Sequence, residues 1–238
     1  MRQERRASII NRENLIISIF LLYHLVMKTM NRSFLPKSLT KESFLEGLSV
    51  LAEVDTDLAR IISAIGPPPL WSREPGFSTM IHIILEQQVS LASAQAAFTK
   101  LNASVSELTP ERFVEFTDES LKEFGFSRQK TTYCRGLAQA ILQGELDLEE
   151  LSRLDDTSAR NKLTELKGIG PWTADIYLLM ALLRPDIWPS GDLALIKAIE
   201  SIKKLPSKPT QETISEVAAQ WIPWRAVAAR VLWHYYLS

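Results

Sequence analysis

Apolar residues recur at helical spacing along almost the whole chain from about Thr40, and no segment alternates apolar and polar residues over a useful length. Residues 41–65 have apolar positions with helical spacing at Phe44, Leu45, Leu48, Leu51, Val54, Leu58, Ile61 and Ile62. The segment Gly66-Pro-Pro-Pro69 ends this pattern, because proline has no amide to donate and clashes with the preceding turn. We therefore predict an all-α fold.

The rest of the chain continues as a series of helices. A long helical stretch is predicted over 77–101, with a break near Ser90, and shorter helices over 109–116, 118–124, 129–143, 148–154 and 157–166. Ser127 is placed to cap the helix that starts near residue 129.

Composition limits the class of protein. A length of 238 residues allows one large domain or two small ones, and 46% hydrophobic with 23% charged residues is ordinary for a globular protein. The single cysteine, Cys134, excludes a disulfide framework, a zinc ribbon and a four-cysteine iron–sulfur cluster. His24, His82 and His234 lie too far apart for a local metal motif. Because the net charge is −1, a nucleic-acid partner would have to be bound by local geometry.

Residues 1–30 differ from the rest of the chain. A basic start is followed by an apolar run over 15–27, which is too short to cross a bilayer as a helix and is not followed by a small-x-small cleavage site. We expect an N-terminal extension, disordered or a lone helix, or a start codon assigned too early, since Met27 and Met30 are both available. A membrane-associated helical protein is the alternative. Because there is no convincing export signal, we expect a bacterial protein to lie in the cytoplasm, associated with the nucleoid. We expect a eukaryotic protein to lie in the nucleus.

The most informative segment runs from Leu163 to Ile199. It opens with Leu163-Thr-Glu-Leu-Lys-Gly168-Ile169-Gly170-Pro171-Trp172. A helix should end near Leu166, the two glycines permit a tight turn, and Pro171 suits the first position of a new helix. Such a helix, hairpin and helix presents free backbone amides to a DNA phosphate. An ordinary helix connection with a glycine cap is the alternative.

A carboxylate is predicted at the start of a later helix. The second helix of the hairpin should end before Arg184-Pro185, and Pro189-Ser-Gly191 does not continue a helix comfortably. A new amphipathic helix begins near Asp192, where the positive end of the helix dipole favours the ionised carboxyl group. A simple aspartate N-cap, which is common, is the alternative for this residue taken alone.

Together, the hairpin, the loop that follows it and Asp192 resemble the helix-hairpin-helix DNA glycosylase superfamily, and most closely its 3-methyladenine DNA glycosylase II branch. Residues 83–90 and 125–133, Trp224-Arg225 and Trp233 fit the same resemblance, which extends from about Phe34 to the end of the chain. It implies two helical subdomains, 76–183 and 31–75 joined to 184–238, with an active cleft between them. It also implies a monomer that binds damaged double-stranded DNA without a stable protein partner.

The resemblance implies hydrolysis of the N-glycosidic bond of an alkylated base, a step of base excision repair, after the nucleotide has been flipped out of the duplex. By position, Gln88 is the candidate wedge that fills the gap, with Gln87 beside it, and a surface-turn residue is the alternative. Asp192 would stabilise the oxocarbenium character of the sugar and orient the attacking water. Asp175 and Asp186 do not match the catalytic position.

Residue 172 decides the subclass that the resemblance implies. Strand-cleaving members have a lysine there, which attacks the sugar and forms a Schiff base, whereas the indole of Trp172 cannot do this chemistry. We therefore expect a monofunctional glycosylase. Trp172 and Trp233 would offer aromatic faces to a cationic base, with core packing as the alternative. The remaining tryptophans are expected to pack in the interior: Trp71, Trp188, Trp221 and Trp224.

No cofactor is expected for catalysis, and a single cysteine leaves no iron–sulfur cluster. The resemblance implies a structural monovalent cation at the hairpin, held by the backbone carbonyls of Thr164, Leu166 and Ile169. A DNA phosphate would bind beside it at Gly168, Ile169 and Gly170. Two alternatives stay open, namely a non-catalytic helix-hairpin-helix DNA-binding protein and an oxidised-purine glycosylase with lyase activity, against which residue 172 argues.

Overall fold

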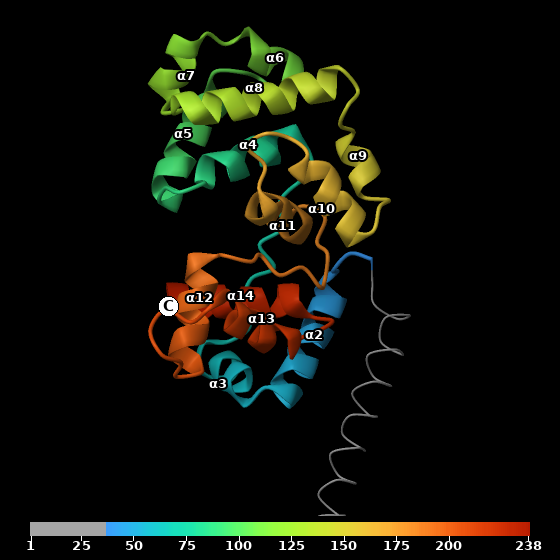
Figure 1. The fold of residues 1–238 in the computed structure, drawn as a ribbon, viewed down its shortest axis with the longest axis vertical. Helices are drawn as coiled ribbons and strands as arrows, with labels where there is room; N and C mark the ends of the chain where they lie inside the picture. Colours follow the sequence, from blue (N-terminus) through green and yellow to red (C-terminus); the bar gives the residue numbers. More distant parts are fainter. Residues whose placement is uncertain (1–36) are drawn as a thin grey trace, which may run out of the picture. The chain divides into compact units, whose positions relative to one another are not determined.

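The computed structural model describes residues 37–238, so the expectations for residues 1–30 lie outside the described residues. Residues 37–238 contain helices and no strand, which confirms the all-α prediction (Figure 1). In order, the helices are α2 (Lys41–Val54), α3 (Thr56–Ile65), α4 (Phe77–Glu86), α5 (Leu91–Ala103), α6 (Pro110–Glu115), α7 (Asp118–Phe124), α8 (Arg128–Leu142), α9 (Leu148–Leu151), α10 (Asp156–Thr164), α11 (Pro171–Met180), α12 (Leu193–Ile202), α13 (Gln211–Ala219) and α14 (Arg225–Leu237).

Most helices lie where the apolar spacing predicts them, and side chains cap their starts. Ser127 caps α8 as predicted, because its hydroxyl oxygen accepts a hydrogen bond of 3.2 Å from the third amide of the helix. Ser90 caps α5 in the same way, at the break predicted within 77–101. Some helices end earlier than the pattern indicates, since α9 stops at Leu151 and α11 at Met180. No helix within residues 37–238 combines the length and the apolar character that crossing a bilayer requires.

One prediction is wrong, because residues 41–65 form two helices rather than one. Asp55 has extended backbone angles, so it ends α2, and its carboxylate caps α3 by accepting from the amides of Asp57 and Leu58. An aspartate side chain competes for nearby backbone amides and therefore favours such a break. The apolar spacing does not reveal the break, because α3 resumes the same periodicity.

Asp55 also joins α3 to the C-terminal helices. Asp55 is only 5% exposed. Its carboxylate accepts hydrogen bonds from Lys203 Nζ at 2.9 Å and from Trp221 Nε1 at 2.7 Å. Burial alone would raise the pKa of Asp55, but these donors and the Leu58 amide lower it below its ordinary value. The ionised carboxylate therefore stabilises the fold above about pH 4, and this contribution is lost as the pH falls further.

We expect Asp55→Asn to lower the free energy of unfolding by about 2 kcal/mol at pH 7, because the Lys203 ammonium is left beside a neutral amide. Chemical denaturation over a pH series measures this difference, which should shrink below about pH 4 as the native carboxyl group takes up a proton. Asp147→Asn is the control, since Asp147 is an exposed N-cap of α9. A deficit that stays constant with pH would contradict the role of the charge.

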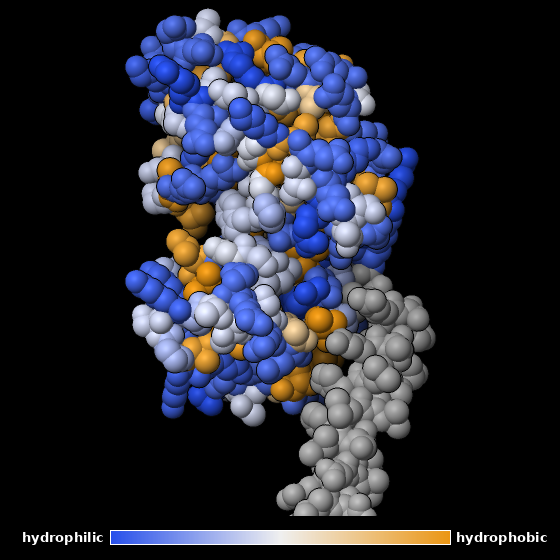
Figure 2. Space-filling view, viewed as in Figure 1, coloured by the Kyte–Doolittle hydropathy of each residue, from blue (hydrophilic) through white to orange (hydrophobic). Residues whose placement is uncertain are grey.

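The helices pack in two groups (Figure 1). Helices α4 to α11 pack among themselves, with α4 against α5, α8 and α11, and with α10 against α11. In the second group, α14 packs against α2, α3 and α12. Figure 2 shows an indentation between the two groups. The predicted subdomain limits, 76–183 and 31–75 with 184–238, stay a prediction, since residues 38–238 form one compact unit.

Arg230 ties the two groups together. This residue of α14 is fully buried, and its guanidinium donates to the carbonyl oxygens of Leu70, Leu179 and Ala226. Burial lowers the pKa of Arg230 to about 9, so it is still charged at neutral pH. Because Leu179 belongs to α11, the arginine fixes the C-terminal helix against the second helix of the hairpin.

Candidate active site

Asp192 lies at the N-terminus of α12, as predicted. Gly191 has a φ of +82°, which glycine adopts without strain, and the Asp192 amide donates to the carbonyl oxygen of Pro189 at 3.2 Å. After this turn, the Leu195 amide donates to Asp192 Oδ1 at 3.0 Å and completes the N-cap. The carboxylate is thereby held at the positive end of the α12 dipole.

Two indole N–H groups also donate hydrogen bonds to the Asp192 carboxylate. Trp172 Nε1 donates to Oδ2 at 2.9 Å, and Trp233 Nε1 donates to Oδ1 at 3.2 Å. Trp172 is half-buried at the start of α11, whereas Trp233, in α14, is 8% exposed. The structure therefore brings together three of the predicted site residues, from three helices, and fixes the orientation of a carboxylate that is itself half-buried.

The hairpin between α10 and α11 requires glycine at position 168. Gly168 has a φ of +97°, and a Cβ atom added there would lie 2.1 Å from Cγ of Tyr133. Tyr133 comes from α8, so its ring packs directly on the hairpin backbone. Gly170 differs, because its φ is −86° and an added Cβ would meet nothing within 4 Å. Packing therefore requires the first glycine, while the second leaves open space beside the hairpin.

The hairpin leaves backbone amides available to a ligand. Within residues 37–238, the amides of Gly170, Trp172 and Thr173 have no acceptor, as expected at the start of a helix. The Ile169 amide is occupied, since it donates to the Leu166 carbonyl oxygen at 3.0 Å, and the Ile169 side chain is buried. A phosphate at the hairpin would therefore use the amides that follow Ile169.

The two glutamines after α4 have different surroundings. Gln87 Nε2 donates to the Gly168 carbonyl oxygen and to Thr173 Oγ1, both at 2.9 Å, and so fastens the turn after α4 to the hairpin. Gln88 is exposed and has a φ of +56°, a left-handed conformation that is strained for a residue with a side chain. Of the two residues, Gln88 is the one whose side chain is not committed to the hairpin.

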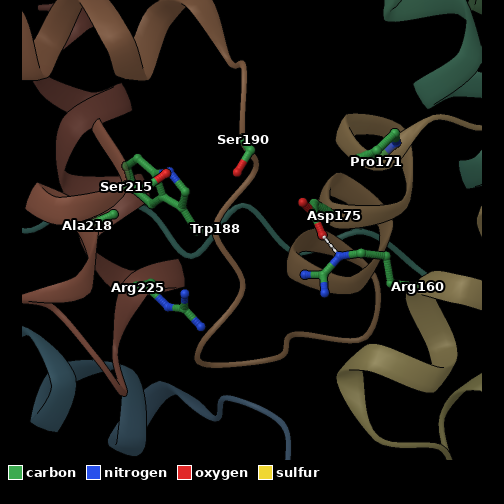
Figure 3. Close-up of a pocket in the computed structure, with 8 residues that line it drawn as sticks. All are labelled: Arg160, Pro171, Asp175, Trp188, Ser190, Ser215, Ala218 and Arg225. Carbon is green, nitrogen blue, oxygen red and sulfur yellow. Dashed lines mark hydrogen bonds and ion pairs between the residues drawn. The ribbon is translucent and has the colours of Figure 1, made fainter. Parts of the chain in front are cut away.

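A cavity of about 330 Å³ lies beside the loop that leads to Asp192 (Figure 3). Its wall consists of Arg160, Pro171, Asp175, Trp188, Ser190, Ser215, Ala218 and Arg225, and includes neither Asp192 nor the two indoles that contact it. Asp175 is 3% exposed, and Arg160 Nε donates to its Oδ1 at 2.6 Å. Sequence reasoning assigned no role to either residue, and only the place of Asp175, one helical turn after Trp172, could have drawn attention to it.

The tryptophans away from Asp192 mostly pack as predicted. Trp188, Trp221 and Trp224 are buried, and the ring centroids of the first two lie 5.6 Å apart. Trp71 is half-buried and makes an edge contact with the His234 ring. Among residues 37–238, no three His, Cys, Asp or Glu side chains gather into a group that could hold a metal ion.

A family model described as HhH-GPD superfamily base excision DNA repair protein matches residues 81–224. This segment contains the hairpin, Trp172 and Asp192, and it covers more than half of the chain. The chain belongs to the HhH-GPD superfamily. Trp233, the second indole on Asp192, lies beyond the matched segment.

Relatives of this HhH-GPD chain include proteins named as glycosylases. DNA-3-methyladenine glycosylase 1 of Schizosaccharomyces pombe is 29% identical over 191 residues, which are 77% of this chain and 83% of that protein. A DNA-3-methyladenine glycosylase of Bacillus subtilis is 32% identical over 123 residues, 52% of this chain and 41% of the relative. The Bacillus subtilis protein YfjP is 28% identical over 186 residues, 75% of this chain and 65% of YfjP. The chain thus spans less than two thirds of the length of both Bacillus proteins.

Solved structures show the same fold. The 3-methyladenine DNA glycosylase Mag1 of Schizosaccharomyces pombe, in complex with abasic DNA, has a TM-score of 0.74 at 28% identity, with 79% of this chain and 95% of that chain covered. A DNA-3-methyladenine glycosidase from Bacillus halodurans has a TM-score of 0.66 at 26% identity, with coverages of 81% and 88%. The HhH-GPD chain therefore resembles these two enzymes both in sequence and in architecture.

Proposed function

We propose that this HhH-GPD protein is a monofunctional DNA glycosylase that hydrolyses the N-glycosidic bond of alkylated bases, of the 3-methyladenine type, in double-stranded DNA. The observation that carries the proposal is the Asp192 carboxylate, which two indole N–H groups and the α12 N-terminus hold in one orientation just after a helix-hairpin-helix. The names of the relatives, and the abasic DNA bound to the similar Mag1 structure, support the substrate class.

Asp192 acts on the deoxyribose. As the bond between the base nitrogen and C1′ breaks, its electron pair leaves with the base and the sugar gains oxocarbenium character. The negative charge of Asp192 stabilises this developing positive charge without first having to reorient, because three donors already fix the carboxylate. A water molecule then forms a bond to C1′ and gives its proton to Asp192. The products are the free base and an abasic site.

Trp172 makes the reaction a hydrolysis. A lysine at this position would supply an amine that attacks C1′ and leads to strand cleavage, whereas the Trp172 indole donates to the Asp192 carboxylate. The DNA strand is therefore expected to stay intact. The half-buried indole of Trp172 lies beside the carboxylate, where its ring face suits a positively charged alkylated base. Trp233 is buried, so it serves this site through its hydrogen bond to Asp192.

The hairpin grips the DNA backbone in this proposal. The amides from Gly170 onward bind a phosphate at the start of α11. Within residues 37–238, the carbonyls of Thr164 and Ile169 accept no backbone hydrogen bond, and that of Leu166 accepts one, from the Ile169 amide. These three carbonyls fit a structural monovalent cation, which would neutralise part of the phosphate charge when bound.

We expect Gln88→Ala to lower the single-turnover rate of base release about tenfold, because alanine cannot fill the gap that the flipped nucleotide leaves. Fluorescence of 2-aminopurine placed beside the lesion measures the flipping step directly. Gln95→Ala, on an exposed face of α5, is the matched control and should not change the rate. An unaltered flipping signal in Gln88→Ala would contradict the wedge.

Base release is the direct test of the proposed function. The full chain is incubated with duplex DNA that has been treated with a methylating agent, released bases are identified by chromatography, and strand breaks are counted before and after alkali. Release of methylated purines, with breaks only after alkali, is the expected result. Binding without base release would make the protein a DNA-binding module, and breaks without alkali would make it a lyase, so either result overturns the proposal.

A further inference from the structure

Three exposed apolar side chains stand next to residues of the candidate site. Val89 and Leu91 follow Gln88, where α5 begins. Leu193 follows Asp192 directly, as the first residue of α12. The three side chains are 45%, 62% and 73% exposed in this order, and the last is the most exposed large apolar side chain in the described part of the chain. We call Val89, Leu91 and Leu193 the apolar rim.

The apolar rim lies on both sides of the indentation between the two groups of helices. Figure 2 shows hydrophobic surface on either side of this indentation, over α5 and over α12. Leu91 is the first residue of α5, and Leu193 is the first residue of α12. Because Asp192 caps α12, a ligand that reaches its carboxylate from the indentation meets apolar side chains from both groups.

Packing within the fold does not account for the apolar rim. The buried face of α12 begins at Leu195, and Leu193 lies outside it. The buried face of α5 begins at Ala94, and Leu91 extends this face by one turn into solvent. Exposed apolar side chains that are scattered singly need no explanation, whereas a group of them beside a candidate site indicates a binding surface.

The backbone on the α5 side of the apolar rim is held in place without DNA. Gln87 Nε2 donates to the Gly168 carbonyl oxygen at 2.9 Å, which fixes the turn after α4 to the hairpin. Ser90 lies between the two rim residues on this side, and its hydroxyl caps α5. The two side chains are therefore presented on an ordered backbone, so little conformational entropy is lost when they contact a ligand.

Opened duplex DNA has the surfaces that such a rim would cover. When a nucleotide leaves the stack, the faces of its two neighbouring bases lose a stacking partner, and these faces are flat and apolar. Proteins that kink DNA insert leucine and similar side chains at such steps. The extruded deoxyribose, on which Asp192 acts in the proposed mechanism, presents C–H groups as well. Intact duplex offers none of these surfaces, because its bases are stacked.

We propose that the apolar rim recognises the opened state of the duplex. Val89 and Leu91 cover the base faces beside the gap, and Leu193 packs on the extruded deoxyribose. This inference rests on the proposed function, because Gln88 and Asp192 define where the DNA lies. Gln88 fills the gap with a polar group, and its apolar neighbours add contact on either side. The rim thus contributes affinity for DNA with a flipped nucleotide and none for intact duplex.

Titrations with two duplexes, followed by fluorescence anisotropy, test the apolar rim. We expect Leu91→Gln and Leu193→Gln each to weaken binding to duplex with an abasic-site analogue about fivefold, because the polar end of glutamine replaces an apolar contact. Affinity for intact duplex of the same sequence should not change. The dependence of binding on salt concentration should also stay the same, since no phosphate contact is removed.

Conservative variants and matched controls separate apolar contact from damage to the fold. Leu91→Met and Leu193→Met should bind both duplexes as the wild type does, because methionine keeps the side chain apolar. Leu45→Gln on α2 and Leu142→Gln on α8 remove exposed leucines outside the rim, one in each group of helices, and should not change binding. All of these variants should melt within about 2 °C of the wild type, since the substituted side chains are exposed.

A fluorescent label gives a readout that does not depend on affinity. The chain has one native cysteine, Cys134, which is buried, so Leu91→Cys offers one accessible thiol for a bimane label. The emission should shift to the blue on saturation with the abasic-analogue duplex and stay unchanged on saturation with intact duplex. A label on Leu45→Cys should respond to neither duplex. An equal shift of the Leu91→Cys label with both duplexes would contradict a contact confined to opened DNA.

The apolar rim and the proposed function can fail separately. If the wild type releases no base but the two glutamine variants bind only the abasic analogue more weakly, the proposed function is wrong and the rim stands. If the wild type releases methylated purines but these variants bind the abasic analogue as tightly as the wild type, the rim is overturned and the proposed function stands. An equal loss of affinity for both duplexes overturns the rim as well.

Discussion

Asp192→Asn is expected to lower the single-turnover rate of base release about a thousandfold or more, since the variant loses the negative charge that faces the sugar. The amide is nearly the same size as the carboxylate and still accepts from the Leu195 amide, so α12 keeps its cap. Its nitrogen, however, cannot accept from an indole, and one of the two N–H groups loses its partner. Rapid-quench assays with an excess of enzyme over alkylated duplex measure the rate, and fluorescence anisotropy measures the affinity, which should change by less than about threefold.

A matched variant separates charge from capping. Asp155 is an exposed aspartate that caps α10, the first hairpin helix, through the amides of Thr157 and Ser158. Asp155→Asn removes a charge at a helix start but should leave base release unchanged, because asparagine caps as well as aspartate. If Asp192→Asn released bases at the parental rate, the mechanism proposed for this site would be wrong.

The second large effect is expected from alanine substitutions at the two hairpin glycines. One substitution should lower stability, and the other should lower affinity for DNA. Gly168→Ala places a Cβ 2.1 Å from the Tyr133 ring at a φ of +97°, so we expect the free energy of unfolding to fall by about 3 kcal/mol. Gly170→Ala meets no atom within 4 Å at a φ of −86°, so stability should hold. Its methyl group occupies space beside the free amides, however, and we expect affinity for duplex DNA to fall about tenfold.

Thermal unfolding and DNA-binding titrations at one fixed salt concentration distinguish the two variants. Gly168→Ala should melt at a temperature roughly 10 °C lower, and Gly170→Ala within about 2 °C of the parent. Gly136→Ala is the control, because Gly136 lies in α8 and an added Cβ there meets nothing within 4 Å. Equal losses of stability in Gly168→Ala and Gly170→Ala would show that packing on Tyr133 does not distinguish the two positions.

The sequence predicts most of the helices because apolar spacing is a local signal that each segment carries by itself. The break at Asp55 is different, because the partners that make it worthwhile are Lys203 and Trp221, which lie 148 and 166 positions away. Without knowledge of those donors, a carboxylate within an apolar repeat is interpreted as one exposed position of a longer helix. Apolar spacing therefore fails to predict the fold where a residue depends on partners that are distant in the sequence.

In the candidate site too, local sequence predicts some features, whereas others depend on residues that are distant in the sequence. The place of Asp192 at a helix start follows from the local residues Pro189, Gly191 and Asp192 itself, and the structure has it there. The resemblance singled out Trp172 and Trp233, but as ring faces for a base. Their N–H groups point to Asp192 across 20 and 41 positions, and hydrogen-bond direction at that range depends on how α11, α12 and α14 pack. The tie between Arg160 and Asp175 was missed for the same reason.

The lone thiol of the chain has a consequence for an enzyme of this proposed kind. Cys134 is completely buried in α8, and burial raises the pKa of its thiol, so the nucleophilic thiolate is scarce and out of reach. Reagents that methylate purine nitrogens are electrophiles, and they also attack exposed thiolates. Burial therefore keeps the one thiol of this chain away from the electrophiles that would create the substrates of the proposed enzyme.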